Sequence, residues 1–194
     1  MKYAFRGRSL SGMLPAAAAL ALLLIGGAPA LAQQPAPAAG GASAAEAQAA
    51  ATKDEMGKYT LPDGTPTYHF SADGTMDWYT YSGYRRYHAE CHVCHGPDGL
   101  GSSYAPALAE SLKTMTHDQF MEVVVNGKQN VGVGQANQVM PAFGENLNVM
   151  CYIDDIYVYL KARADGVLDR QRPSKREDKT KAYGDNENQC FGRK

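Results

Sequence analysis

Two cysteines and a histidine lie within five consecutive residues, in the segment Cys91–His95, whose sequence is Cys-His-Val-Cys-His. Two thiols three positions apart on one helical turn can each add to a vinyl group of haem and form a thioether bond. The histidine that follows at once is then placed under the iron as its proximal ligand. The spacing therefore predicts covalent attachment of one haem c through Cys91, Cys94 and His95.

Three other uses of this cysteine pair compete with haem attachment. A structural zinc site needs two more ligands with similar spacing, but the remaining cysteines, Cys151 and Cys190, are isolated in the sequence. A thioredoxin-like redox pair follows a strand of a β-α-β unit, and the sequence indicates no such unit. An unmodified disulfide leaves His95 without a role. Haem attachment is the interpretation that uses all three residues.

The second axial ligand of the iron is predicted to be Met140, in the sequence Val-Met-Pro-Ala-Phe. Pro141 keeps this segment out of a helix, so that the thioether can project toward the iron. Met115, Met121 and Met150 are competing candidates, but they lie near or within predicted helices, where most methionines fill the core. Met140 is therefore the expected sixth ligand.

A histidine that ligates a metal usually donates its second ring N–H to an acceptor. For His95 the expected acceptor is the carbonyl of Pro106. The glycines of the intervening segment Gly96–Gly101 allow the backbone to turn tightly beside the haem. The same glycines resemble a dinucleotide-binding pattern, but no strand precedes them, and we reject that interpretation.

Helices must carry these ligands. Apolar and aromatic residues recur with helical spacing before Cys91 and predict a helix from Ser82 to Glu90. A second helix should begin at Thr116, with Gln119 completing a capping box, and end at Asn126-Gly127.

The last helix of the haem domain is predicted to be capped by Asn148 and to end at Gly166. It should cross the first helix, where Gly83 allows close approach and Tyr87 can meet Tyr159.

Composition divides the chain into five segments. Residues 1–32 are predicted to be a signal peptide cleaved after Ala32, because a basic start and a short apolar run precede an A-x-A cleavage site. A membrane anchor is the alternative, but proline and glycine interrupt the run and leave it too short for a stable span. The other segments are a flexible Ala/Pro-rich linker (33–57), a hairpin-like extension (58–80), the helical haem domain (81–168) and a charged C-terminal tail (169–194).

Export would place the protein in the periplasm, an oxidising compartment. Cys151 and Cys190 can pair there as a disulfide that ties the tail to the last helix. Two free thiols are the alternative.

Charge is unevenly distributed along the chain. The formal net charge is −1, but residues 33–160 hold 14 acidic and 6 basic side chains, a net charge of −8. Residues 161–194 hold 10 basic and 6 acidic side chains, a net charge of +4. An acidic haem domain with a basic tail argues against nucleic-acid binding and favours a charged protein partner.

The chain resembles the class I c-type cytochromes. The resemblance spans roughly residues 81–166 and rests on the first helix, the Cys91–His95 motif, Pro106, the Met140-Pro141 loop and the last helix. It implies a mainly α fold, with a single class I cytochrome c domain preceded by the hairpin-like extension.

Three further segments, Tyr84–His88, Ser102–Pro106 and Val149–Asp155, are similar to the four-cysteine, methanol-metabolism-related c-type cytochromes. That resemblance implies a periplasmic carrier that accepts electrons from a quinoprotein alcohol or methanol dehydrogenase, of the lanthanide-dependent type. The onward acceptor would be another cytochrome c or a terminal oxidase.

With His95 and Met140 both bound, the iron has no open site for oxygen or peroxide, and one electron can pass with little ligand movement. We therefore expect an electron-transfer protein and not an enzyme. Two alternatives stay open. One is a haem enzyme of the peroxidase type, in which Met140 leaves the iron. The other is a haem-bearing interaction subunit of a larger oxidoreductase, which binds its partner through the hairpin and the basic tail.

Overall fold

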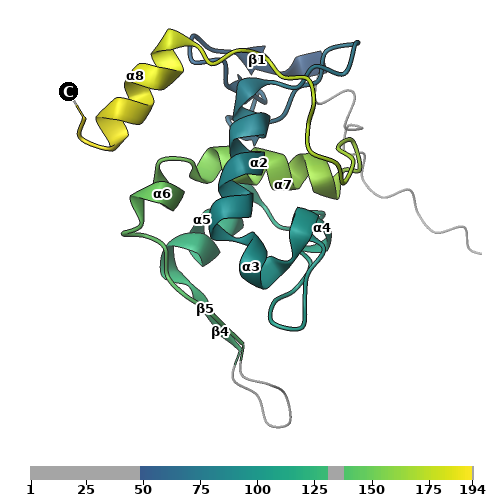
Figure 1. The fold of residues 1–194 in the computed structure, drawn as a ribbon, viewed down its shortest axis with the longest axis vertical. Helices are drawn as coiled ribbons and strands as arrows, with labels where there is room; N and C mark the ends of the chain where they lie inside the picture. The colour runs from purple at the N-terminus through teal and green to yellow at the C-terminus, as the bar shows by residue number, and fades with distance from the viewer. Residues whose placement is uncertain (1–48, 131–137, 194) are drawn as a thin grey trace, which may run out of the picture. The chain divides into compact units, whose positions relative to one another are not determined.

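Two helices, α2 and α7, cross at the centre of the fold (Figure 1). The structure is a computed structural model that describes residues 49–130 and 138–193. The elements in chain order are β1 (Thr52–Lys53), β2 (Tyr59–Thr60), β3 (Pro66–Thr67), α2 (Trp78–Glu90), α3 (His92–His95), the 3-10 helix η1 (Pro97–Gly99), α4 (Leu108–Ser111), α5 (His117–Asn126), β4 (Lys128–Asn130), β5 (Gln138–Met140), α6 (Leu147–Met150), α7 (Ile153–Ala164) and α8 (Lys181–Cys190).

The crossing of α2 and α7 depends on Gly83. A Cβ at this position would lie 1.8 Å from the carbonyl oxygen of Asp155, so the two backbones touch where only glycine fits. Tyr87 and Tyr159 pack beside the crossing with their ring centroids 5.4 Å apart, and both side chains are buried. The predicted meeting of the first and last helices is therefore confirmed.

α2 begins at Trp78, one turn before the predicted start at Ser82. The buried side chain of Asp77 caps it by accepting a hydrogen bond from the amide of Thr80 at 2.8 Å. The prediction was wrong here because Trp78, Tyr79 and Thr80 are residues typical of strands. The cap overrides that preference.

The last helix was also predicted incorrectly, because it is two helices, α6 and α7. Asn146, and not Asn148, caps α6 by accepting a hydrogen bond from the amide of Asn148. The helix breaks at Cys151 and Tyr152, which turn toward the C-terminal segment. Tyr152 has a φ of −136° and a ψ of 18°, outside helical geometry, and donates a hydrogen bond to Glu187.

The capping box of α5 is confirmed: Thr116 accepts from the amide of Gln119, and the Gln119 side chain accepts from the amide of Thr116. The helix ends at Asn126, followed by Gly127 with a φ of +74°.

The segment before α2 contains a small antiparallel sheet in the order β1-β2-β3, with Lys53 opposite Tyr59 and Tyr59 opposite Thr67. β1 lies within residues 33–57, the predicted linker, so pairing begins before the predicted extension.

The C-terminal segment is ordered against the rest of the fold. The main chain of Met76 pairs with Lys175 and Glu177, and α8 follows, capped by Thr180. A disulfide joins Cys151 to Cys190, with the Cα atoms 5.9 Å apart. Residues 169–194, read from the sequence as a charged tail, therefore contain a helix that is bonded to the haem domain.

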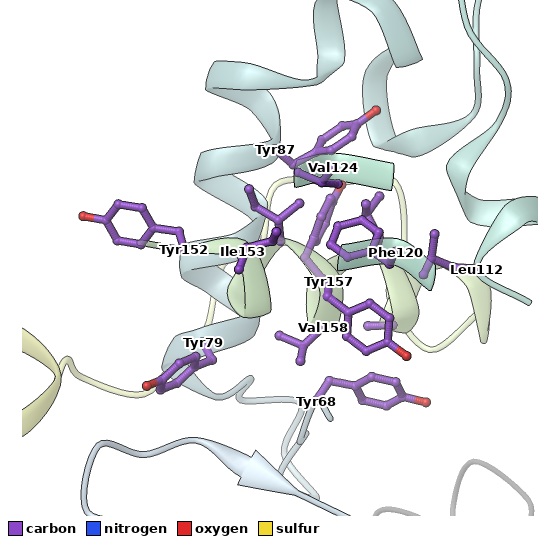
Figure 2. Packing of buried hydrophobic residues seen from close by; sticks show 14 of the residues in the cluster. Tyr68, Tyr79, Tyr87, Leu112, Phe120, Val124, Tyr152, Ile153, Tyr157 and Val158 are labelled. Carbon is purple, nitrogen blue, oxygen red and sulfur yellow. The ribbon is translucent and has the colours of Figure 1, made fainter. Parts of the chain in front are cut away.

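The core is rich in tyrosine. Figure 2 shows buried side chains from several elements gathered around α7. The labelled residues are Tyr68, Tyr79, Tyr87, Leu112, Phe120, Val124, Tyr152, Ile153, Tyr157 and Val158. None of the helices in the described part of the chain is long and apolar enough to cross a membrane. The predicted signal peptide, residues 1–32, lies outside the described residues.

Candidate functional site

A largely apolar cavity of about 450 Å³ lies between α3, α4, α5, β5 and α7. Ligand pockets in proteins commonly have volumes of this order. All five predicted haem residues, Cys91, Cys94, His95, Pro106 and Met140, line it. Its apolar walls come from Ala105, Leu108, Phe120, Val123, Val124, Val139, Pro141, Phe143, Val149, Ile156 and Leu160.

The two thiols of the motif stand at the junction of α2 and α3. Both cysteines are free, Cys91 half-buried and Cys94 exposed. Burial, with smaller contributions from Glu90 and Cys94, raises the pKa of the Cys91 thiol to about 12. Thiol-disulfide exchange needs a thiolate, which burial disfavours at Cys91. The described residues also include no group of three or more His, Cys, Asp or Glu side chains arranged to hold a metal ion.

His95 is held in one orientation at the cavity wall. It is 6% exposed, and its Nδ1 lies 3.0 Å from the carbonyl oxygen of Pro106, the acceptor expected from the sequence. A carbonyl can only accept, so Nδ1 carries the proton and Nε2 keeps its lone pair. The imidazole is therefore prepared to act as a metal ligand through Nε2.

The loop after His95 is folded tightly against α2. The amide of Gly101 donates to the carbonyl of His95 at 2.8 Å. Gly96 has a φ of +72°, and a Cβ there would lie 2.2 Å from the carbonyl oxygen of Gly101. The Tyr87 hydroxyl donates to the carbonyl of Gly96 and accepts from the amide of Gly99. These contacts fix the distance between the motif and Pro106.

Met140 reaches the cavity from the end of β5. It pairs with Lys128, and Gly127 allows this pairing because a Cβ there would lie 2.6 Å from the Met140 carbonyl oxygen. The amide of Phe143 donates to the carbonyl of Val124 at 2.9 Å, which anchors the segment after Met140 to α5.

Met115 also lines the cavity, whereas Met121 and Met150 are not among its lining residues. Two methionines therefore have access to the site. The sequence argument that set Met115 aside for lying near a helix does not distinguish them.

Four polar residues at the cavity were not predicted as site residues: Glu90, Tyr104, Ser111 and Lys128. Glu90 adjoins Cys91, and Lys128 lies opposite Met140 in the β4-β5 ladder. The sequence signal for Glu90 was its position beside the motif. Lys128 has no such local signal, because strand pairing brings it to the site.

Comparison with known proteins gives several matches. Residues 80–160 match the family described as cytochrome c oxidase, cbb3-type, subunit III. The chain is 56% identical over 137 residues to cytochrome c-553I of Paracoccus denitrificans, covering 71% of this chain and 60% of that protein. It is 40% identical over 94 residues to cytochrome c-555 of Methylococcus capsulatus, covering 48% of this chain and 69% of that protein.

Among solved structures, the c-type cytochrome XoxG from Methylobacterium extorquens AM1 is 55% identical, with a TM-score of 0.67. The match covers 75% of this chain and 88% of that chain. The chain belongs to the c-type cytochromes. This cytochrome therefore carries covalently bound haem c, as its relatives' names imply, and the predicted class I, mainly helical fold is confirmed.

The residues at the cavity fit haem c. The walls are apolar, two thiols one helical turn apart line the space, and so does a histidine whose Nδ1 is bonded to Pro106, which leaves Nε2 for a metal. The chain spans about 60% of the length of cytochrome c-553I.

Proposed function

We propose that this cytochrome is a periplasmic one-electron carrier. It accepts electrons from a quinoprotein alcohol or methanol dehydrogenase and passes them to another cytochrome c or toward a terminal oxidase. The observation that carries the proposal is that His95 and Met140 line one apolar cavity. The resemblance of Tyr84–His88, Ser102–Pro106 and Val149–Asp155 to the methanol-metabolism-related cytochromes supports the choice of donor.

Each residue of the site then has a defined role. Cys91 and Cys94 would hold the haem through thioether bonds. His95 would bind the iron through Nε2, while its Nδ1–H, donated to Pro106, fixes the ring and makes it a stronger ligand. Met140, which lines the same cavity, would supply the second ligand. Haem with these two ligands supplies a one-electron Fe(III)/Fe(II) couple. The apolar walls exclude water from this couple.

Exposed apolar side chains surround the site and favour docking of a partner there. Tyr104 is 74% exposed and Val139 60%, and both also line the cavity. Val93, between the two cysteines, is 75% exposed. Large exposed apolar groups such as Tyr104 and Val139 at the cavity are typical of a protein contact surface. The net charge of −8 in residues 33–160 favours a basic patch on the dehydrogenase.

Two features support the periplasmic location. The signal sequence predicted in residues 1–32, with cleavage after Ala32, implies export. The disulfide between Cys151 and Cys190 fits an oxidising compartment.

The donor is tested by mixing the oxidised cytochrome with purified quinoprotein dehydrogenases and following haem reduction. We expect rapid reduction by a methanol dehydrogenase in the presence of methanol, with a rate that falls as salt rises. Equal turnover with a Cys91→Ser, Cys94→Ser protein would instead indicate an interaction subunit that needs no haem.

The sixth ligand is tested with a matched pair of variants, Met140→Leu and Met115→Leu. We expect Met140→Leu to abolish the methionine-to-iron charge-transfer band of the oxidised protein, and Met115→Leu to keep it. The reverse result would assign the ligand to Met115. A wild-type spectrum without this band would favour a peroxidase-type enzyme.

A further inference from the structure

A group of arginines lies on α2 and on the segment that follows α7. Arg85, Arg172 and Arg176 are exposed, and we call them the arginine face. The guanidinium of Arg176 lies 4.6 Å from the centroid of the Tyr81 ring. Arg172 and Arg176, beside the Tyr81 hydroxyl, favour its ionised form and hold the pKa of Tyr81 below its ordinary value. Arg85 lies one helical turn after Tyr81.

The arginine face is held in place by the backbone beneath it. The amide of Met76 donates to the carbonyl of Lys175 at 3.3 Å, and the amide of Glu177 donates to the carbonyl of Met76 at 2.8 Å. Arg176, between these two bonds, also lies over the Trp78 ring at 5.5 Å. A side chain already fixed on aromatic rings loses little conformational entropy when a partner binds. Arginines of this kind are frequent binding hot spots.

The charge of the arginine face is not neutralised within the described residues. Two neighbouring bases have carboxylate partners: Lys175 pairs with Asp73 and Arg170 with Asp98. By contrast, no ion pair in the described part of the chain involves Arg85, Arg172 or Arg176. They stay unpaired there although residues 33–160 carry a net charge of −8. The cytochrome thus presents a cationic surface on an otherwise acidic domain.

Aromatic contacts along α2 connect this surface with the haem motif. Ring centroids are 6.3 Å apart for Tyr81 and Tyr84, 4.4 Å for Tyr84 and His88, and 5.7 Å for His88 and His92. His92 lies between the two motif cysteines. Ten residues of helix separate Tyr81 from Cys91, a rise of about 15 Å. The arginine face is therefore on the haem-bearing helix but distinct from the cavity opening.

We propose that the arginine face is a second docking surface, which binds the acidic surface of the protein that takes the electron onward. This inference rests on the proposed carrier function. Charge complementarity supports this partner. The basic patch of the dehydrogenase is attracted by the acidic haem domain but repelled by the arginine face, whereas an acidic acceptor is attracted by the arginine face. The two partners of the carrier are then distinguished by charge.

The test uses the reduced holo-cytochrome and an acidic plastocyanin as the electron-accepting probe, with oxidation followed by stopped flow. The variant is Arg172→Glu, Arg176→Glu. The matched control is Lys181→Glu, Arg193→Glu, which makes the same change in net charge on α8 and just after it. At low salt we expect the first variant to be oxidised on the order of tenfold more slowly, and the control to stay within about twofold of wild type.

Folding is controlled with Arg172→Gln, Arg176→Gln, which should give an intermediate rate and an unchanged haem spectrum. Equal slowing by both charge-reversal pairs would overturn the proposal, because net charge alone would then explain the rate. Binding to phosphatidylglycerol vesicles that requires Arg172 and Arg176, with no change in oxidation, would also overturn it and assign the surface to a membrane. Reduction by the dehydrogenase should not be slower in either pair. If the dehydrogenase does not reduce the wild-type cytochrome, that result would count against the proposed function instead.

Discussion

The two faces of α7 are built from different chemistry. Ile156 and Leu160 face the cavity and offer only apolar surface. On another side, Asp155 accepts a hydrogen bond from Tyr183 of α8 at 2.7 Å, and Tyr152, just before α7, bonds Glu187. The cavity face of α7, with Ile156 and Leu160, needs a cofactor to pack against it. The α8 face, with Asp155, already packs against other residues of the chain. The cavity face therefore serves electron transfer, and the α8 face stabilises the helix that frames it.

The largest effect should come from leaving the cavity face incomplete. Cys91→Ser, Cys94→Ser should yield a mature protein whose mass is that of its amino acids alone, because no thioether can form. An unfilled cavity of about 450 Å³ costs up to about 11 kcal/mol at roughly 24 cal/mol per Å³, which is comparable to the whole stability of a domain. Near-ultraviolet circular dichroism should therefore show lost tertiary packing. A cooperatively folded, haem-free variant would contradict the view that this face needs its cofactor.

The next effect concerns the α8 face. Removing the disulfide with Cys151→Ala, Cys190→Ala should lower the free energy of unfolding by about 4 kcal/mol, because the bridge closes a long loop in the unfolded chain. Denaturant titration measures this loss. The haem spectrum should not change, since neither cysteine lines the cavity. A lost methionine-to-iron band would show instead that the two faces are coupled.

The same comparison explains what could be predicted from the sequence. The haem motif, the Pro106 acceptor and the Thr116 capping box involve residues close together in the chain, so spacing alone reveals them. Met140 was predicted through Pro141, a local signal, and it lines the cavity. The sequence did not predict that Met115 lines the cavity. Its position there depends on how α4 packs against α7.

The α8 face could not be predicted because its contacts join distant segments. Arg86 lies 3.5 Å over the ring of Tyr152 and pairs with Glu187, and Ser82 bonds Tyr183. Local composition around Tyr183 is polar, which is typical of a solvated tail. Only the tertiary fold shows that these polar groups satisfy one another.

A third prediction concerns the contact that holds α7 against α2. Gly83→Ala should lower stability by about 3 kcal/mol, because the new Cβ meets the backbone of Asp155 and cannot be relieved by a side-chain rotation. Gly184→Ala in α8 is the matched control. Its φ is ordinary and its nearest neighbour is the Lys179 side chain at 3.8 Å, so alanine should stabilise the helix by up to about 1 kcal/mol. Thermal unfolding of both holoproteins measures the difference, and similar shifts would refute the close crossing.

The smallest effect is a pH dependence that separates two adjacent carboxyl groups. Burial raises the pKa of Asp155 to about 7, although hydrogen bonds from Ser82 and Tyr183 oppose it. Burial also acts on Asp154, but the hydrogen bonds and charges of Lys58 and His117 together outweigh it and lower the pKa of that carboxyl. Asp155 therefore stabilises the fold in its protonated form and Asp154 in its ionised form.

The signs of these two shifts give opposite slopes. The folded state binds the Asp155 proton more tightly than the unfolded state does, so stability should fall by about 1 kcal/mol per pH unit as pH rises from about 5 to 7. Asp155→Asn should remove this slope while keeping the hydrogen bond to Tyr183 of α8. Denaturant midpoints of both proteins across this range measure the effect. Asp154 loses its contribution to stability only in acid, below its usual pKa, so it does not titrate in this range. A pH dependence of stability that survives in Asp155→Asn would therefore assign the titrating group to a site other than the α8 face of α7.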